Sequence, residues 1–317
     1  MSSGTATSEY RTLIQGCGLV DRSERGKLAL TGGQAKEFLQ GQISNDVESL
    51  SPGEGCYAAL LTPKGKMLGD LRVLDSGDEL LLDTERVALQ ELFNMIRRFS
   101  IGYDAQLHKR TLERGLVSLI GPASEEVAGV RGIDAAEHSH VVARIGGVEV
   151  RAIRTDVGLD LLCHSADTAA LVSALEAAGA APVAEEVAEI VRVEHGRPRY
   201  GVDLDDSVIP QEAGLNDRAV SFTKGCYVGQ ETVARLFYRG KPNRHLRGLR
   251  LQTPASPGDQ IVLGEKTVGN ISSVAESPEL GAIALALVRR EAAPGATVSV
   301  GPQGTTAELV ELPFSTA

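Results

Sequence analysis

The sequence contains no tryptophan, and aromatic residues make up only 4% of its 317 positions. Single-stranded nucleic acid is usually held by aromatic side chains on which the bases stack, so this composition argues against such a platform. The net charge of −10 points the same way, because affinity for nucleic acid depends on neutralising phosphates with basic side chains. We therefore expect no nucleic-acid partner.

Cysteine is also scarce. The four cysteines are Cys17, Cys56, Cys163 and Cys226, and no two of them have C-x-x-C spacing. This pattern predicts neither a disulfide framework nor a closed zinc site, and it is typical of a protein kept in a reducing compartment. We expect a cytoplasmic location.

Long hydrophobic runs are missing as well. No stretch approaches the roughly 20 apolar residues of a membrane span, and the longest clean run, 282–288, has the length of a strand. The first 20 residues lack the basic start and apolar middle of a secretion signal. We expect no membrane partner. The 42% apolar and 23% charged content is that of an ordinary globular chain, long enough for two or three packed units.

The first 243 residues alternate short strands with helices. Strands are predicted at 28–30, 57–61, 67–74, 80–83, 141–145 and 148–153. Helices are predicted at 34–40, after a cap at Thr84 with Ala88, Leu92, Met95, Ile96 and Phe99 inward, after a cap at Asp167, and from Ala184 onward. The clearest hairpin joins 141–145 to 148–153 through Gly146-Gly147, because two-residue glycine turns match the twist of paired strands.

The pattern changes near Lys241-Pro242-Asn243. Beyond this point, short β-rich runs at 246–251, 260–263, 283–288, 298–300 and 307–312 alternate with Gly/Pro turns. Such spacing is typical of a small antiparallel barrel. The sequence thus predicts an α+β protein with a first region at 1–243 and a C-terminal β-barrel at 244–317.

One octapeptide has the composition of a reactive site. Residues 224–231 read Lys-Gly-Cys-Tyr-Val-Gly-Gln-Glu, and a helix-compatible stretch starts around Gly229. An ammonium group and a helix N-terminus both favour a thiolate, so Lys224 and Cys226 form a candidate thiol site. Gly225 and Gly229 allow sharp turns and close approach of a ligand. A buried structural cysteine in a tight turn also fits, because free cysteine is among the most buried residue types.

The same region is strongly basic. Lys224 to Arg250 holds seven basic residues and one acid, Glu231, and carries +6 in a chain of net charge −10. A solvated basic face that balances an acidic one explains this run. A surface that meets an anionic ligand or an acidic partner explains it equally well. The sequence leaves both interpretations open.

A second candidate is Glu194, near the end of the helix that starts at Ala184. Val187, Ile190 and Val191 form the apolar stripe of this helix, and Glu194 falls on the same face. A carboxylate on an inward face needs a partner, because an unpaired buried charge is costly. Alternatively, Glu194 bends out to solvent or pairs with Arg192 or Arg197.

Metal chemistry finds little support. His138-Ser139-His140 could hold a metal, but no third ligand lies nearby in the sequence. We expect this stretch to be a loop, and we expect no metal site.

The octapeptide resembles the K-G-C-[FY]-x-G-Q-E hallmark of the YgfZ-type branch of the folate-binding glycine-cleavage T-protein superfamily, also called the aminomethyltransferase or GcvT superfamily. Further stretches resemble the same family in the same order. They are Gly32, Phe38 to Gly41, Asn45 to Val47, Pro63 to Lys66 leading to Asp70, Arg192 to Gly196, Tyr200 to Asp203 and Ile209 to Glu212. The resemblance covers nearly the whole chain.

The resemblance implies a three-part ring of two interleaved α+β units plus the barrel, with tetrahydrofolate or a one-carbon derivative as cofactor. It places Asp70 near the reacting folate nitrogen and gives Glu194, in R-x-E-x-G, a hydrogen bond to the pterin. Further expected cofactor contacts are Tyr200, Gly225, Gly229 and Gln230. The basic segment would face the anionic tail of folate.

The resemblance also implies a role. Aminomethyltransferases lack the Lys-Gly-Cys, whereas the YgfZ-type branch is associated with assembly or repair of iron–sulfur clusters, aided by folate. A thiolate at Cys226 suits that task, because soft thiolates bind iron, although one cysteine cannot hold a cluster without a client protein. We expect such a maintenance factor, acting on iron–sulfur clients or assembly proteins, rather than a turnover enzyme.

Two alternatives stay open. The first is a folate-dependent aminomethyltransferase or demethylating transferase that uses Asp70 as its polar catalytic group. The second is a thiol enzyme independent of folate, with Cys226 as nucleophile; the absence of an identifiable histidine partner counts against it.

Overall fold

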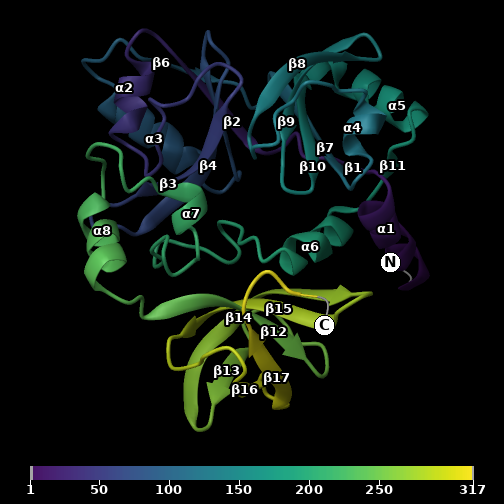
Figure 1. The fold of residues 1–317 in the computed structure, drawn as a ribbon, viewed down its shortest axis with the longest axis vertical. Coiled ribbons are helices and arrows are strands. Elements are labelled where there is room, and N and C mark those ends of the chain that lie inside the picture. Colours follow the sequence, from purple (N-terminus) through teal and green to yellow (C-terminus); the bar gives the residue numbers. More distant parts are fainter. Residues whose placement is uncertain (1–2, 316–317) are drawn as a thin grey trace. The chain divides into compact units, whose positions relative to one another are not determined.

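The computed structural model describes residues 3–315 and divides into two compact units, each assembled from three chain segments (Figure 1). The first unit takes the described part of Met1–Thr62 with Leu68–Ala188 and Arg218–Val228, and the second takes Pro63–Met67, Glu189–Asp217 and the described part of Gly229–Ala317. Over residues 3–315, no helix is long and apolar enough to cross a membrane.

One sheet of the first unit has five strands in the order β3-β4-β5-β2-β6. Their bounds are β2 Gly26–Thr31, β3 Gly55–Leu61, β4 Met67–Asp75, β5 Leu80–Thr84 and β6 Gln106–Lys109. Helices α2 (Ala35–Gln40) and α3 (Leu89–Phe99) cover one face, because their apolar residues Phe38 and Ile96 pack into the core of the sheet (Figure 1). The strands predicted between 28 and 83, and the helix predicted at 34–40, are confirmed.

The second sheet of this unit has six strands in the order β11-β1-β7-β10-β9-β8. Their bounds are β1 Gly18–Asp21, β7 Arg114–Ile120, β8 His140–Ile145, β9 Val148–Arg154, β10 Gly158–His164 and β11 Ala181–Pro182. Helices α4 (Ser124–Ala128) and α5 (Thr168–Ala177) pack on it. The predicted hairpin is confirmed as β8 and β9, and its turn needs glycine because Gly146 and Gly147 have φ of 56° and 85°.

The two sheets meet through an apolar cluster to which both contribute: Ala29, Leu74, Leu81, Leu116, Ile153 and Leu162. The remaining helical elements are α1 Ser3–Gln15, the 3₁₀ turn η1 Ser165–Asp167, α6 Glu185–Glu194, α7 Asn216–Ala219 and α8 Gln230–Arg239. Asp167 occupies the N-cap position of α5 as predicted, but its side chain makes no capping hydrogen bond.

The C-terminal strands form a closed six-stranded antiparallel barrel in the order β12-β15-β14-β13-β16-β17, with β17 paired to β12. Their bounds are β12 Arg244–Leu251, β13 Gln260–Leu263, β14 Lys266–Ser277, β15 Gly281–Arg289, β16 Thr297–Val300 and β17 Thr305–Val310. The predicted fold class, α+β with a small antiparallel barrel, is confirmed. Strand β14 has no sequence prediction, because its buried positions include Ser273, Ala275 and Ser277, whose small side chains weaken the apolar alternation.

The expected start of α3 is wrong. Thr84 does not cap this helix: it is the last residue of β5, and its hydroxyl donates to the Asp70 carbonyl at 2.5 Å. The helix begins at Leu89 instead, with Ala88 at the N-cap position. Phe99, expected to point inward, ends the helix and is 48% exposed. The Thr84 hydroxyl thus bonds within the sheet instead of capping the helix, and the apolar spacing of the helix does not reveal this contact.

Candidate functional site

Asp70 is a carboxylate buried in the five-stranded sheet. It lies on β4 and is 7% exposed, and the Tyr57 hydroxyl from β3 donates to its Oδ2 at 2.5 Å. Over residues 3–315, its second oxygen, Oδ1, has no hydrogen-bond partner. Burial raises the pKa of Asp70 to about 6, and the Tyr57 hydrogen bond opposes this rise. The group is therefore ionised at neutral pH but close to its titration point, which suits an acceptor of protons.

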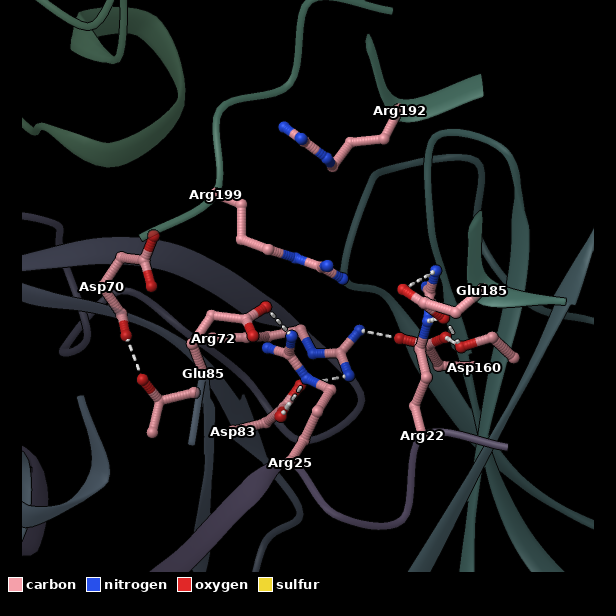
Figure 2. Close-up of polar contacts among 12 residues, drawn as sticks. Arg22, Arg25, Asp70, Arg72, Asp83, Glu85, Asp160, Glu185, Arg192 and Arg199 are labelled. Atoms are coloured by element: carbon pink, nitrogen blue, oxygen red, sulfur yellow. Dashed lines mark hydrogen bonds and ion pairs between the residues drawn. The ribbon is translucent and has the colours of Figure 1, made fainter. Parts of the chain in front are cut away.

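A chain of ion pairs lies beside Asp70 and connects the two sheets of the first unit (Figure 2). Arg72 on β4 donates to Asp83 on β5 and to Asp160 on β10, each at 2.7 Å. Arg25 donates to the other oxygen of Asp83 at 2.9 Å and also pairs with Glu85. These pairs are largely buried, and the two guanidinium groups hold the pKa of Asp83 below its usual value against the effect of burial. The network ties β4, the strand that carries Asp70, to β5 and β10.

Arg218 and His138 lie beside the Tyr57 ring, and Glu137 lies near both of them. The guanidinium carbon of Arg218 lies 5.1 Å from the centre of the Tyr57 ring. Arg218 Nη2 lies 2.7 Å from Glu137 Oε1, and His138 Nε2 lies 3.7 Å from the same oxygen. The ring centres of His138 and Tyr57 are 6.5 Å apart. We call Glu137, His138 and Arg218 the Tyr57 bracket.

Lys224, the lysine of the octapeptide, links two segments of the first unit through hydrogen bonds. Lys224 is 9% exposed, and its ammonium donates to the carbonyls of Gln40, Ile43 and Asn45 at 2.7, 2.9 and 2.6 Å. Burial lowers the pKa of Lys224 to about 8. All three ammonium hydrogens thus have carbonyl acceptors, so Lys224 can act on Cys226 only through space. Its contacts tie the octapeptide to the segment that follows α2.

Cys226 is exposed, unlike the buried Cys17 and Cys163 and the half-buried Cys56, and all four thiols are free. The alternative of a buried structural cysteine is therefore wrong. The predicted helix start is confirmed, because α8 begins at Gln230 with Gly229 at its N-cap and a φ of 85°. Gly225 is open: a Cβ there would meet nothing within 4 Å. The thiol is presented on an accessible loop.

In the second unit, Glu194 is the last residue of α6 and is half-buried. The predicted apolar face is present, since Val187 and Val191 are buried. Arg192 donates to Asp203 at 2.7 Å and to Glu189 at 2.9 Å. Asp203 also accepts from the hydroxyls of Ser272 and Ser273, which fixes the segment after α6 against the barrel.

The second unit also brings together the stretch 63–67, the start of α8 and the stretch around Val208. Gly65, with a φ of 75°, lies so close to α8 that a Cβ would be 2.9 Å from Thr232 and 3.3 Å from the Gly229 carbonyl. Met67 donates its backbone N–H to the carbonyl of Val208 at 2.9 Å. Glycine at 65 is therefore required by close packing. Tyr200, an expected cofactor contact, forms a parallel bridge with Leu204, and Gln230 is the half-buried first residue of α8.

The metal interpretation of His138 and His140 gains nothing from the structure: over residues 3–315, no three His, Cys, Asp or Glu side chains gather in metal-binding geometry. His140 begins β8 rather than lying in a loop. Sequence reasoning also missed Tyr57. Its contact with Asp70 depends on how β3 pairs with β4, and the strands predicted at 57–61 and 67–74 do not determine that register. Nothing in the sequence links Arg218 or Glu137 to this position.

Two units whose chain segments alternate in the sequence, one with a buried carboxylate in its sheet and the other with a closed barrel, are the features to compare with known proteins. Residues 2–224 match the family profile described as the GCVT N-terminal domain. Residues 244–315 match the glycine cleavage T-protein C-terminal barrel domain. The chain belongs to the glycine cleavage T-protein family.

Several relatives are named aminomethyltransferase. The protein of that name from Streptomyces avermitilis is 30% identical, over 98% of this chain and 90% of its own length. The one from Rubrobacter xylanophilus is 28% identical, over 97% and 85%. A putative chloroplastic transferase of Arabidopsis thaliana is 28% identical, over 93% and 71%. The crystal structure of the glycine cleavage system aminomethyltransferase T from Bartonella henselae matches 98% of this chain and 90% of its own with a TM-score of 0.88 at 23% identity, which shows the shared fold.

Proposed function

We propose that this protein is a tetrahydrofolate-dependent one-carbon transferase of the aminomethyltransferase type. The observation that carries the proposal is Asp70, a carboxyl buried in a sheet and oriented by one hydroxyl, with its other oxygen unbonded among residues 3–315. The names of the relatives favour this function over the iron–sulfur role expected from the octapeptide. A cytoplasmic location, which the four free cysteines favour, belongs to the same proposal.

The chemistry of these side chains fits a folate. A reduced pterin presents N–H groups, and the unbonded Oδ1 of Asp70 is a hydrogen-bond acceptor suited to one of them. Glu194 is a second carboxylate that we assign to the pterin, and Tyr200, Gly225, Gly229 and Gln230 are further assigned contacts. When bound, tetrahydrofolate supplies the nitrogen atoms that receive a one-carbon unit.

In this proposal Asp70 accepts and later releases the proton of the reacting nitrogen. The ionised carboxyl accepts the proton that a nitrogen loses as it gains a bond to carbon, and its pKa near 6 allows it to release that proton again near neutral pH. Tyr57 holds Oδ2, so the acceptor oxygen has a fixed direction. The buried setting strengthens the interaction, because few waters compete for the carboxylate.

The test is turnover of an aminomethyl or methylamine donor in the presence of tetrahydrofolate. Asp70→Asn should lose at least 100-fold in kcat, which is the usual contribution of a general acid or base. Asp206→Asn is the control, because Asp206 is an exposed aspartate. If Asp70→Asn turns over donor as fast as the wild type, Asp70 is not the catalytic carboxyl. If calorimetry finds no tetrahydrofolate binding to the wild type, the cofactor is wrong.

Exposed Cys226 supports a second candidate function, that of the YgfZ-type branch: folate-aided maintenance of iron–sulfur clusters in client proteins. An accessible thiol on an open loop is able to meet a client, whereas a buried one is not. Cys226→Ser should then keep tetrahydrofolate affinity and donor turnover but fail to restore iron–sulfur enzyme activity in cells that lack the protein. Full restoration by Cys226→Ser would remove the thiol from this function.

A further inference from the structure

The Tyr57 bracket contains a residue in an uncommon conformation. His138 has a φ of 74°, a left-handed value that non-glycine residues seldom adopt. Its N–H donates to the Arg154 carbonyl at 2.9 Å, and Gly55 lies so near that a Cβ there would be 2.8 Å from the His138 carbonyl oxygen. The His138 backbone thus packs against the start of β3 and the end of β9, and its ring centre lies 6.5 Å from that of Tyr57.

The His138 side chain also carries an unmet polar group. Its Nδ1 is buried and has no hydrogen-bond partner among the described residues. Burial lowers the pKa of His138 to about 4, so the imidazole is neutral at neutral pH. Backbone strain together with an unsatisfied buried nitrogen is unfavourable, and such features persist where a local geometry has a use.

The only ring that His138 contacts among the described aromatic pairs is that of Tyr57, which Arg218 also covers. Arg218 and His138 converge on one oxygen of Glu137. We propose that Glu137, His138 and Arg218 are positioning residues that press the Tyr57 hydroxyl onto Asp70 and so set how readily Asp70 takes up a proton. This inference rests on the proposed function, in which Asp70 is the proton acceptor.

The charges around Asp70 give the bracket its effect. The Tyr57 hydrogen bond favours the ionised carboxyl, as does Arg25, whereas Asp83 and Glu85 disfavour it. The Arg218 guanidinium lowers the pKa of Tyr57 against the effects of burial and Asp70, which makes the hydroxyl a stronger donor. A displaced ring would leave Asp70 buried without this donor, and its pKa would rise.

The experiment is a carboxyl carbon-13 NMR titration of protein labelled at aspartate, without folate. The Asp70 resonance is assigned by its absence from Asp70→Asn. The test variants are Tyr57→Phe, Glu137→Gln and Arg218→Lys, the last keeping the charge while losing the planar group. The control is Glu149→Gln, because Glu149 also pairs with an arginine, Arg144, but both side chains are 69% exposed.

Tyr57→Phe should raise the pKa of Asp70 by about one pH unit, the scale of one hydrogen bond to a charged group. Glu137→Gln and Arg218→Lys should raise it by about half as much, and Glu149→Gln should not change it. Removing the charge of Glu137 would by itself lower the pKa of Asp70, so the direction separates the two effects.

The proposal is overturned if Tyr57→Phe raises the pKa of Asp70 but Glu137→Gln and Arg218→Lys both leave it unchanged or lower it. If Glu137→Gln does not fold, Arg218→Lys decides alone. A purely structural bracket would lower the melting temperature and leave the Asp70 titration in place. Because the titration involves no folate and no turnover, its result is separate from the assay that tests the proposed function.

Discussion

Asp70→Asn should make the protein more stable at pH 7. The pKa of Asp70 lies near 6 in the folded protein and near 3.8 when it is solvated, so folding favours the protonated carboxyl. Above the unfolded pKa, the unfolded state gains by ionising Asp70 while the folded state resists it. The wild type therefore loses stability as the pH rises from about 4 to about 6, and asparagine removes this loss.

The size follows from the pKa difference of about two units. At 1.36 kcal/mol per unit, ionised Asp70 costs up to about 3 kcal/mol at pH 7, and we expect a gain of about 1–3 kcal/mol because asparagine still offers an oxygen to Tyr57. A gain of this size from replacing a buried ionisable residue with a neutral one is the sign of a site that gives up stability for function.

Urea unfolding followed by far-ultraviolet circular dichroism measures the effect, since the chain has no tryptophan for fluorescence. The curves are recorded at pH 7 and pH 4 for Asp70→Asn, the wild type and the exposed control Asp206→Asn. The gain should be present at pH 7 and largely absent at pH 4. Lower stability of Asp70→Asn at pH 7, or an equal gain at both values, would refute the reasoning.

Three further predictions concern the first unit. Arg72→Met should lower the free energy of unfolding by about 3–5 kcal/mol, because it leaves Asp83 and Asp160 buried without their shared cation. The control Arg144→Met, in an exposed pair, should leave the free energy of unfolding almost unchanged in the same assay. Lys224→Met should lower the free energy of unfolding by about 1–3 kcal/mol and speed amide exchange in the 40–45 segment, because three carbonyls lose their donor. Unchanged exchange would contradict the role of Lys224 in linking the two segments. Iodoacetamide should modify Cys226 before Cys17 or Cys163, because Cys226 is exposed and burial raises the pKa of the other two thiols. Peptide mass mapping shows the order of modification, and the reverse order would contradict the exposure of Cys226.

Local patterns predicted much of the fold. The hairpin at Gly146-Gly147 and the helix start at Gly229 depend on neighbours in sequence, and both are present. The barrel strands at 246–251 and 260–263 are short runs rich in apolar residues and were found, whereas β14 was missed because serine, asparagine and glycine weaken its pattern. Thr84 shows the opposite failure, a plausible cap whose hydroxyl has a better partner in the sheet.

The candidate site was less accessible to such reasoning. Asp70 was expected from a resemblance, but its partner Tyr57 follows only from strand pairing. Arg218 reaches Tyr57 from far along the chain, and nothing in composition or periodicity encodes that contact. Lys224 was chosen for its position next to Cys226, whereas its bonds to the carbonyls of Gln40, Ile43 and Asn45 follow only from the fold, because a long side chain reaches acceptors far away in the sequence.

The three carbonyl bonds of Lys224 also bear on how the chain is made. They span about 180 positions, and the segment Arg218–Val228 completes a unit that otherwise ends at Ala188. A nascent chain released from the ribosome up to Ala188 has both sheets but lacks this closing piece. Contacts at such separation slow folding, since a long loop must close before they form. The first unit therefore reaches its final state only after part of the second has been synthesised, and a truncation before Lys224 should leave the segment after α2 open to proteases.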